Sequence, residues 1–203
     1  MEHSFPGPEK KNIVYNPTFE QMRSFSSGQE TTTEYGSPSY VTEVRSRIAD
    51  RTKNQVDHEF EEDFEELREA RESLEDRDMV CVDRKVGGGD HSYVCRYYVP
   101  KEHARIALEW SQLLDSAVRE PDFVTVQLPE WETQMVRIFP SDGVTYVLGS
   151  DYSGEAKKSF LRLFMYYEKM RGGLGLHAGS KRVKMDTGDG LGTVGQLFLG
   201  LSG

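Results

Sequence analysis

The amino-acid sequence predicts an α/β fold in which helices pack on a mixed β-sheet. Two observations carry this prediction. Short runs rich in β-branched and aromatic residues recur through the middle of the chain, and between them lie longer segments whose apolar residues repeat with a helical period. Strands and helices that alternate in this way are typical of a sheet covered by helices. The predicted strands are residues 79–86, 91–100, 122–129, 134–140 and 144–150.

The composition restricts both the location and the partners of the protein. Its 203 residues are enough for one well-buried domain. The chain has 34 acidic and 25 basic residues, and its net charge of -9 argues against a nonspecific nucleic-acid binder, which needs a basic face for phosphate. No apolar run approaches the roughly 20 residues that span a bilayer, and the first residues lack the apolar core of a signal peptide. We therefore expect a cytoplasmic protein that binds neither nucleic acid nor membrane.

The two cysteines are expected to be plain thiols. Cys81 and Cys95 are too few for a disulfide framework, and no second pair of cysteines or histidines provides the spacing of a zinc site. Both fall in predicted strands, so we expect reduced side chains in or near the core.

The first 40 residues are predicted to form a loose N-terminal arm. They are rich in proline, glycine, serine and threonine, and they show neither the helical nor the strand period. The regular pattern begins after this segment, so we expect the α/β domain to cover residues 41–190.

A charged helix is predicted over residues 57–78. Phe60, Phe64, Leu67 and Leu74 follow a helical spacing on a strongly acidic background, as in an amphipathic surface helix. The acidic residues suit a partner-binding or metal-buffering strip as well, but a solvated helix face accounts for them. We assign them no function.

A hairpin turn and a second helix follow. The glycines of the segment "GGGD" (residues 87–90) supply the positive φ angles that a turn between the first two predicted strands needs. Residues 100–120 begin with a proline and place a broad apolar face toward the sheet, which predicts a helix. His103 lies on this helix and is expected to be an ordinary surface or boundary residue.

The last quarter of the chain contains the residues that indicate chemistry. The strand 144–150 passes through a tight turn into a helix that ends at Gly172. With Ser153 as the N-cap, Lys157 and Lys158 fall in the first turn, where the positive end of the helix dipole disfavours basic residues. Either both lysines are solvated, or they face an anion or a metal in a partly uncharged form.

Two further segments belong with this helix. Residues 173–183 are predicted as a glycine-dense strand that carries His177, and glycines in a strand mark the close approach of a ligand or of another backbone. A single histidine there can equally be structural. The run Leu197–Leu201 is predicted as an apolar strand that leads into a glycine-serine-glycine exit. Because the ends of consecutive elements cluster at one edge of an open α/β sheet, we expect these features to meet in one ligand site.

Three motifs in these segments, "YSGEAKKS", "GGLGLHAGSK" and "GQLFLGLSG", resemble the ATP-dependent phosphoenolpyruvate carboxykinase family. In that family a Tyr-x-Gly-Glu-x-Lys-Lys motif is followed, about 19 residues after its second lysine, by a histidine, and Lys158 and His177 have this separation. A strand then leads into the phosphate-binding loop, of which the sequence keeps the beginning. The retained loop residues are Gly200, Leu201, Ser202 and Gly203.

The resemblance, which covers about residues 40–203, implies a fold and a reaction. The chain would be the N-terminal, substrate-side domain of a two-domain carboxykinase, with the first strand and the start of the phosphate loop of the nucleotide domain in residues 191–203. The enzyme would convert oxaloacetate and ATP to phosphoenolpyruvate, CO2 and ADP, a step of gluconeogenesis, with Mn2+ at the active site and Mg2+ bound with ATP. Because the rest of the loop and an aspartate metal ligand would follow Gly203, we expect the 203-residue chain alone to be inactive.

The resemblance also implies roles for the residues of the motifs. Lys158 and His177 would bind the manganese ion and, with the four loop residues, line the nucleotide site. Lys157 and Lys158 would be catalytic, with Lys157 charged and facing the enolate oxygen or the transferred phosphate. Tyr152 and Lys158 would contact the substrate.

An earlier segment implies the substrate arginine. "TEVRSRIADRT" resembles the Gly-Arg-Ser-Pro-x-Asp segment of the family. This alignment makes Arg45 the residue that binds a substrate carboxylate through a bidentate fork, and Arg47 is the alternative in a register shifted by two residues.

Two other functions remain open on the residues alone. The chain could be a noncatalytic acidic α/β binding module in which the lysines and the histidine are surface features, or part of a different P-loop kinase. A reading frame that continues with Thr-Gly-Lys-Thr and an acidic metal-binding segment would favour the carboxykinase over both.

Overall fold

The structure is a computed structural model that describes residues 2–43, 50–117 and 119–200. It divides into two compact units, residues 1–164 and 165–203, which are described separately below. The first unit contains the main sheet and most of the helices. The second contains the end of the last helix and a two-stranded hairpin.

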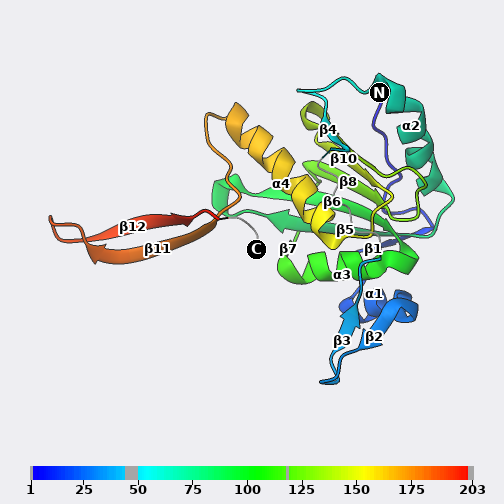
Figure 1. Cartoon of the computed structure of the whole chain (residues 1–203), viewed down its shortest axis with the longest axis horizontal. Helices are drawn as coiled ribbons and strands as arrows, with labels where there is room; N and C mark the ends of the chain where they lie inside the picture. Colours follow the sequence, from blue (N-terminus) through cyan, green and yellow to red (C-terminus); the bar gives the residue numbers. More distant parts are fainter. Residues whose placement is uncertain (1, 44–49, 118, 201–203) are drawn as a thin grey trace. The chain divides into compact units, whose positions relative to one another are not determined.

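The sheet of the first unit is mixed, as the sequence predicts. The strand order is β1-β5-β6-β8-β10-β9-β4, and the short strand β7 also pairs with β5 (Figure 1). Four neighbouring pairs are parallel, namely β1 with β5, β6 with β8, β8 with β10, and β4 with β9, whereas the remaining pairs are antiparallel. The strands are β1 (Ile13–Tyr15), β4 (Thr52–Asn54), β5 (Met79–Val86), β6 (Tyr93–Pro100), β7 (Asp115–Ser116), β8 (Phe123–Leu128), β9 (Met135–Phe139) and β10 (Val144–Leu148).

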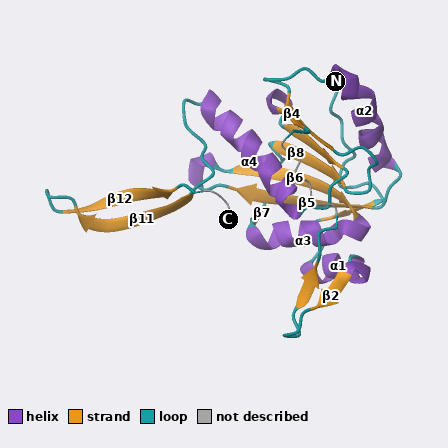
Figure 2. Cartoon of the chain, viewed as in Figure 1, coloured by secondary structure: helices purple, strands orange, loops and turns teal. Residues whose placement is uncertain are grey.

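Helices cover both faces of this sheet, which confirms the α/β class (Figure 2). The helices are α1 (Phe19–Phe25), α2 (Phe64–Glu72), α3 (Ala104–Leu113) and α4 (Ser153–Met170). On one face, Leu67 of α2 joins a buried cluster with Tyr98 and Tyr146 of the sheet. On the other, Trp110 of α3 stacks on Phe160 of α4, with ring centroids 4.8 Å apart. In the described part of the chain, no helix combines the length and the apolar character needed to cross a membrane.

The helix α3 is shorter than predicted. It begins at Ala104 after a 3-10 turn over Lys101–His103, and the backbone becomes extended at Leu114. Residues 115 and 116 form β7 against β5 instead of a further helical turn. At the C-terminal end of α3, residues 115 and 116 therefore pair with β5 although the sequence pattern favours a helix, because tertiary contacts often override a weak local preference.

The prediction that the first 40 residues form a loose arm is wrong for several elements. The strand β1 pairs in parallel with β5, and Ile13 lies opposite Met79. Thr18 and Gln21 form a capping box at the start of α1. These elements are too short to show a period in the sequence, and they gain their stability from the sheet and from α3.

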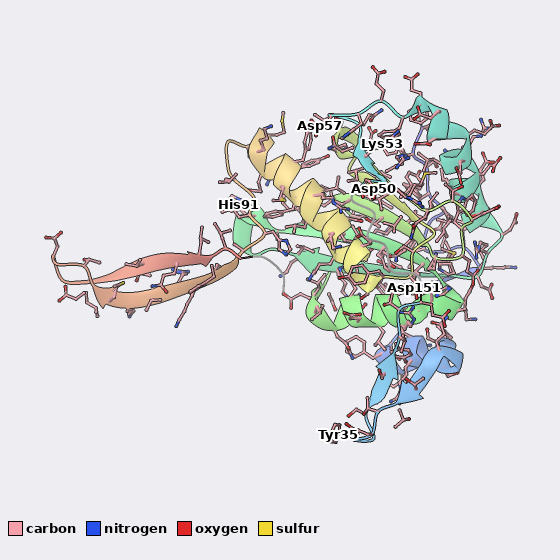
Figure 3. The ribbon with its side chains drawn as sticks, in the orientation of Figure 1. Tyr35, Asp50, Lys53, Asp57, His91 and Asp151 are labelled. Carbon is pink, nitrogen blue, oxygen red and sulfur yellow. The ribbon has the colours of Figure 1, made fainter. Side chains whose placement is uncertain are left out.

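A hairpin extends from this N-terminal region. It consists of β2 (Glu30–Thr32) and β3 (Pro38–Tyr40), which pair antiparallel. Figure 3 shows Tyr35 at the tip of the hairpin, where its side chain is 86% exposed. The base is fixed, because Arg23 of α1 forms two hydrogen bonds of 2.6 Å to the Glu30 carboxylate.

His3 anchors the N-terminal segment in the core of the first unit. Its ring packs edge-on against Phe139 with a centroid distance of 4.3 Å, and its Nδ1 atom lies 3.1 Å from the Tyr146 hydroxyl. Its Nε2 atom lies 3.6 Å from Asp142 Oδ2. Burial lowers the pKa of His3 from 6.5 to about 4, and Asp142 acts in the opposite direction.

Acidification is therefore expected to weaken the fold through His3. Because the pKa is lower in the folded protein than in the unfolded chain, the neutral ring contributes stability above pH 6.5, and this contribution is lost as the pH falls toward 4. Complete loss corresponds to about 3 kcal/mol. We expect His3→Gln to flatten the pH dependence of the urea midpoint over this range. The control is His58→Gln, at an exposed position, which should leave the pH dependence of the urea midpoint as in the wild type. The same pH dependence in His3→Gln would show that the buried His3 ring does not cause it.

Both cysteines lie in the core of the first unit, as predicted. Cys81 on β5 and Cys95 on β6 are free and buried. Burial raises the pKa of Cys81 to about 12 and raises that of Cys95 well above its usual value. Thiols held in this protonated form are poor nucleophiles, so neither residue is a candidate for catalysis.

The second unit contains an antiparallel hairpin of β11 (Gly179–Asp186) and β12 (Leu191–Phe198). The apolar strand predicted at Leu197–Leu201 thus begins earlier, at Leu191, and ends at Phe198, while Leu201 lies outside the described residues. Leu197, Phe198 and Leu199 are each more than half exposed within this chain. The expected boundary between residues 190 and 191 separates two strands that pair with each other.

Candidate active site

The loop between β10 and α4 leads into the Tyr-x-Gly-Glu-x-Lys-Lys segment. Gly149 begins this loop with a positive φ of 64°. A Cβ atom at this position would lie 2.9 Å from the Cα atom of Gln134 and 3.0 Å from two carbonyl oxygens, so only glycine allows the strand to turn here. The next residues, Ser150 and Asp151, are buried, whereas Tyr152 is 36% exposed.

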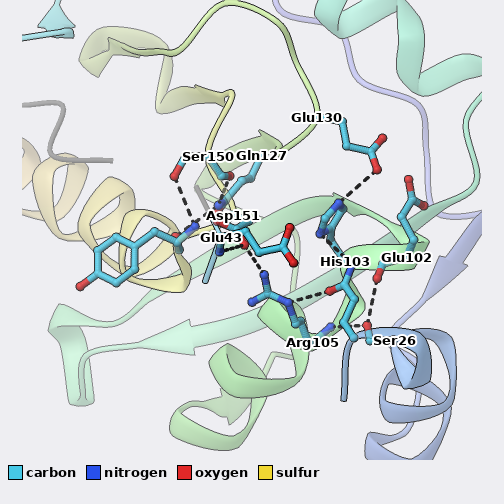
Figure 4. Close-up of polar contacts among 11 residues, drawn as sticks. Ser26, Glu43, Glu102, His103, Arg105, Gln127, Glu130, Ser150 and Asp151 are labelled. Carbon is cyan, nitrogen blue, oxygen red and sulfur yellow. Dashed lines mark hydrogen bonds and ion pairs between the residues drawn. The ribbon is translucent and has the colours of Figure 1, made fainter. Parts of the chain in front are cut away.

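A buried glutamine on β8 holds the backbone of this loop. Gln127 Nε2 donates hydrogen bonds to the carbonyl oxygens of Ser150 and Tyr152, at 2.8 and 3.2 Å. Gln127 Oε1 accepts a hydrogen bond of 3.0 Å from the Tyr97 hydroxyl. The loop is therefore fixed from the sheet below it, as Figure 4 shows for the bonds to the loop.

Asp151 connects the same loop to two other parts of the first unit. Its Oδ2 atom accepts hydrogen bonds from Arg105 Nη2 at 2.6 Å and from the backbone N–H of Glu43 at 2.9 Å. Arg105, labelled in Figure 4, belongs to α3, and its Nε atom also donates a hydrogen bond of 2.7 Å to Gln29 Oε1. Three segments that are distant in the sequence thus meet directly beside Tyr152.

The tyrosine ring folds over the start of α4. A Cβ atom on Gly154 would overlap this ring, so the glycine of the motif is required for the observed position of Tyr152. The Lys158 ammonium lies 4.7 Å from the centroid of the same ring, within the range of a cation–π interaction. The tyrosine, the glycine and the second lysine of the motif therefore form one packed group.

Substituting Gly154 is expected to displace the Tyr152 ring. In Gly154→Ala the new methyl group takes the space of the ring, and contact with Lys158 is lost. We expect nuclear Overhauser effects between the Tyr152 ring and the Lys158 side chain to disappear. Gly28→Ala is the matched control, because a Cβ atom there meets nothing within 4 Å. Retention of the Tyr152–Lys158 contacts in Gly154→Ala would contradict the packing.

The two lysines lie in the second turn of α4 rather than the first. Because α4 already includes Ser153, its first turn contains Glu155, the residue type that the helix dipole favours there. Glu155 is buried and lies 2.9 Å from the Lys158 amine and 3.4 Å from Arg162. The expected repulsion of lysines by the helix end is thus replaced by an ion pair. Lys158 must leave this pair and lose a proton before it can bind a metal.

Lys157 is an exposed residue of the same helix. It shares a hollow of about 120 Å3 with Tyr152 and with residues of α3. The lining residues are Glu109, Trp110, Leu113, Tyr152, Ser153, Gly154 and Lys157. The ammonium of Lys157 is therefore available to an anionic ligand.

Several residues of the expected site are not brought together by the structure. Arg45 and Arg47 lie outside the described residues, as do Leu201, Ser202 and Gly203. Gly200 is exposed and belongs to no helix or strand. The choice between the two arginines, the convergence of the substrate arginine with Tyr152, and the nucleotide loop therefore remain predictions.

His177 is not on a strand, contrary to the expectation. It is exposed and lies in the segment between α4 and β11, which begins only at Gly179. The glycines at 173 and 175 serve close packing instead, since a Cβ atom on Gly175 would approach the Met165 backbone to 2.7 Å. His177 belongs to the second unit and Lys158 to the first, so their meeting at a metal ion is still a prediction.

Another group of possible metal ligands occurs on the first unit. Glu102, His103 and Glu130 offer atoms that lie within 4.8 Å of one another. His103 is buried, with Nε2 3.3 Å from Glu130 and Nδ1 3.4 Å from Gln29, so the expectation of a surface or boundary residue is wrong. Arg77 Nη2 lies 2.8 Å from Glu130 and 3.8 Å from Glu102. This guanidinium already neutralises the carboxylates, and an ion pair explains the group.

Sequence reasoning missed the residues that support the loop. Gln127 gave a signal, because it is a large polar residue between the apolar residues Val126 and Leu128 of a predicted strand. Asp151 gave another, because it follows a buried strand directly before the motif. Arg105 gave none, since a basic residue on a helix is ordinary at the surface and this one is only 7% exposed.

Known proteins resemble this chain over most of its length. A family profile described as phosphoenolpyruvate carboxykinase matches residues 16–203. The phosphoenolpyruvate carboxykinase (ATP) of Aeropyrum pernix is 33% identical over 197 residues, which cover 95% of this chain and 40% of the relative. The chain thus spans less than half the length of that relative. The region matched by the profile begins directly after β1 and includes the packed group on α4, and the chain belongs to the ATP-dependent phosphoenolpyruvate carboxykinase family.

Proposed function

We propose that the protein containing this chain converts oxaloacetate and ATP to phosphoenolpyruvate, CO2 and ADP, and that it acts in gluconeogenesis in the cytoplasm. The observation that carries the proposal is the packed group of Tyr152, Gly154 and Lys158 at the start of α4, in a chain of this family. The support from the relative is its printed name, phosphoenolpyruvate carboxykinase (ATP).

The reaction has two bond-breaking steps. Cleavage of the carbon–carbon bond to the carboxylate next to the methylene releases CO2 and leaves the electron pair on the enolate. The enolate oxygen then attacks the γ-phosphorus of ATP, and the bond from that phosphorus to the β-γ bridging oxygen breaks to release ADP. Negative charge develops on the enolate and on the transferred phosphoryl group, so fixed positive charge lowers the barrier. The exposed ammonium of Lys157 suits this role, because it faces a hollow that Tyr152 also lines.

Substrate binding requires a cation for the carboxylates and a surface for the carbon skeleton. We assign the first role to Arg45, whose guanidinium can hold a carboxylate with two parallel hydrogen bonds. Tyr152 provides the second, with a ring that is fixed by Gly154 and still 36% exposed. Both residues must act on one small molecule, which makes their relative position important for the rate.

The family implies a divalent metal, and the donor types in this chain fit one. An imidazole and a neutral amine are nitrogen donors that can bind a divalent transition metal, and the family implies Mn2+, so Lys158 and His177 would hold it, and Mg2+ would arrive with ATP. When bound, such an ion stabilises negative charge on a substrate oxygen as a Lewis acid. When no metal is bound, the Glu155 carboxylate holds the Lys158 side chain in place, with Nζ and Oε1 2.9 Å apart. The nucleotide would contact Lys158, His177 and the segment 200–203.

The proposal is tested by measuring the formation of phosphoenolpyruvate and of ADP in the same reaction. The natural protein that contains this chain is mixed with oxaloacetate, ATP, Mg2+ and Mn2+, and phosphorus NMR is used to detect phosphoenolpyruvate. We expect one phosphoenolpyruvate for each ADP formed. ADP with inorganic phosphate in place of phosphoenolpyruvate would indicate another ATP-using enzyme, and the absence of both products would favour a noncatalytic binding module. The 203-residue chain alone is expected to give no turnover.

A further inference from the structure

Gln127 lies where the carboxyl ends of two parallel strands meet. In the pairing of β8 with β10 it is opposite Val147, two residues before Gly149, at which the loop that carries Tyr152 begins. The Gln127 side chain is fully buried. A large polar side chain is stable in such a place only when its hydrogen-bonding groups have partners, so these partners explain why a glutamine occupies the position.

The amide of Gln127 is fixed in one orientation. Its Nε2 atom faces the carbonyl oxygens of Ser150 at 2.8 Å and of Tyr152 at 3.2 Å, and a carbonyl oxygen can only accept (Figure 4). In the flipped amide, Oε1 would face both of these oxygens. Oε1 instead accepts a bond of 3.0 Å from the Tyr97 hydroxyl. Burial raises the pKa of Tyr97 well above its usual value, so this hydroxyl stays protonated and donates.

The sheet and α3 hold Tyr97 in turn. It lies on β6 opposite Thr125 of β8, which makes Tyr97 and Gln127 diagonal neighbours on one face of the sheet. Its ring is fully buried, with its centroid 5.6 Å from that of Trp110 on α3. The hydroxyl that orients Gln127 therefore belongs to the packed core of the first unit.

Both backbone groups of Tyr152 are held at this place. The Tyr152 N–H donates to Ser150 Oγ at 3.3 Å. The Tyr152 carbonyl oxygen accepts from Gln127 and also, at 3.0 Å, from the N–H of Glu155 in the first turn of α4. One oxygen thus joins the sheet to the helix that carries Lys158. The Tyr152 ring and the Lys158 ammonium, 4.7 Å apart, remain partly exposed and can reach a ligand.

We infer that Gln127 is a positioning residue, whose amide fixes the Tyr152 carbonyl and thereby the Tyr152 ring and the start of α4 in the place from which they act on oxaloacetate. This inference rests on the proposed function. Gln127 is too deeply buried to touch the substrate, so it acts only through the backbone it holds. A misplacement of about 1 Å at a reacting site can cost about 100-fold in rate, so a fixed donor beneath Tyr152 matters for catalysis.

Three variants separate positioning from stability. Gln127→Met keeps an unbranched side chain of similar size but has no amide. Tyr97→Phe keeps the two donors of Gln127 and removes the hydroxyl that orients them. The double variant Gln127→Met/Tyr97→Phe leaves no hydroxyl without an acceptor, so it should recover part of the stability lost in Gln127→Met without restoring the donors.

Thr125→Val is the matched control. Thr125 lies on the same strand and the same face as Gln127, and it is also fully buried. Its hydroxyl has no hydrogen-bond partner among the residues that the structure describes. This change therefore alters a buried polar side chain of β8 without altering the support of the loop.

The first experiment needs no catalysis. Hydrogen exchange of the backbone over residues 150–156 is measured by mass spectrometry in the natural protein that contains this chain. We expect Gln127→Met and the double variant to speed exchange in this segment by at least about tenfold, because the loop loses its bonds to the sheet. Thr125→Val should change it by less than about threefold.

The second experiment compares steady-state kinetics with stability in the same protein. In Gln127→Met, kcat/KM for oxaloacetate is expected to fall about 10- to 100-fold, while KM for ATP stays within about twofold. The two values separate because Gln127 bonds to the backbone of Tyr152 and to none of the described residues proposed to contact ATP. Tyr97→Phe should lower kcat/KM for oxaloacetate about two- to tenfold, the value of one hydrogen bond. Thr125→Val should leave it near that of the wild type.

The double variant decides between positioning and stability. We expect its urea midpoint to lie above that of Gln127→Met while its kcat/KM for oxaloacetate remains as low. Recovery of kcat/KM together with the urea midpoint, or unchanged exchange over residues 150–156 in Gln127→Met, would overturn the inference. Should Gln127→Met fail to fold, an unchanged kcat/KM in Tyr97→Phe overturns it as well. If the wild-type enzyme forms no phosphoenolpyruvate, the proposed function fails, and the exchange result still shows whether Gln127 fixes the loop.

Discussion

Replacing Lys158 with methionine is expected to lower the turnover of oxaloacetate with ATP by at least about a thousandfold, or about 4 kcal/mol in the activation free energy. Methionine keeps the length and the apolar stem that packs on the Tyr152 ring, but it removes the amine. The proposed site then loses both a metal ligand and the partner of Glu155. The measurement is kcat of the natural enzyme, with circular dichroism to establish that the fold is intact.

Lys85→Met is the matched control for this change. The Lys85 side chain is 40% exposed and lies 3.5 Å from Asp115, and the Lys158 side chain is 35% exposed and lies 2.9 Å from its own carboxylate partner. Both substitutions thus remove a half-exposed, ion-paired ammonium from the first unit. We expect Lys85→Met to change kcat less than twofold. A kcat of Lys158→Met within tenfold of the wild type would show that the amine is not part of the catalytic site.

Replacing Asp83 with alanine is expected to lower the free energy of unfolding of the first unit by about 3 to 5 kcal/mol, because it leaves a buried cation without a partner. The Asp83 carboxylate accepts hydrogen bonds of 2.9 and 2.7 Å from Arg96 and one of 2.8 Å from the Tyr15 hydroxyl. Arg96 is 13% exposed, so water cannot fully replace the lost carboxylate. Tyr15 belongs to β1, and the substitution therefore also weakens the attachment of the edge strand.

Urea unfolding followed by tryptophan fluorescence measures this loss. Trp110 and Trp131 both lie in the first unit, so the signal reports on the sheet that contains Asp83. The double variant Asp83→Leu/Arg96→Leu should recover part of the stability, because it removes the stranded charge together with its partner. A loss below about 1 kcal/mol in Asp83→Ala would contradict the assigned role of the pair.

The sequence predicted best those elements whose pattern is long enough to be visible. The strand 79–86 is found with these bounds, since eight residues of β-forming character end at a glycine turn. The strand Ile13–Tyr15 was missed, because three residues carry no period and its order comes from pairing with β5. For residues 173–178 the sequence predicted a strand that the structure does not contain, since β11 begins only at Gly179. Their glycines resemble a strand next to a ligand, but they allow close packing on the end of α4.

The candidate site divides in the same way. The motif residues 152–158 could be found because they are contiguous, and the structure packs Tyr152 against Lys158. The ion pair between Asp151 and Arg105 could not be predicted from the sequence, because the two residues are 46 positions apart and only the fold brings them together. The argument from the helix dipole failed for a simpler reason. The helix begins one residue earlier than predicted, which moves the lysines into the second turn and leaves Glu155 in the first.

The strand order also bears on how the chain is made at the ribosome. The two strands of the main sheet that come first in the sequence, β1 and β4, occupy its two edges, and each pairs in parallel with a strand that is synthesised much later. Arg137 Nη1 donates a hydrogen bond to the backbone carbonyl of Arg51, which lies beside β4 and 86 residues earlier in the chain. At about 5 to 20 residues per second, Arg51 waits about 4 to 17 s after its own synthesis until Arg137 has been added to the chain. During that interval the nascent chain has its edge strands unpaired, so chaperone contact during translation matters more for this topology than for a sheet built in order.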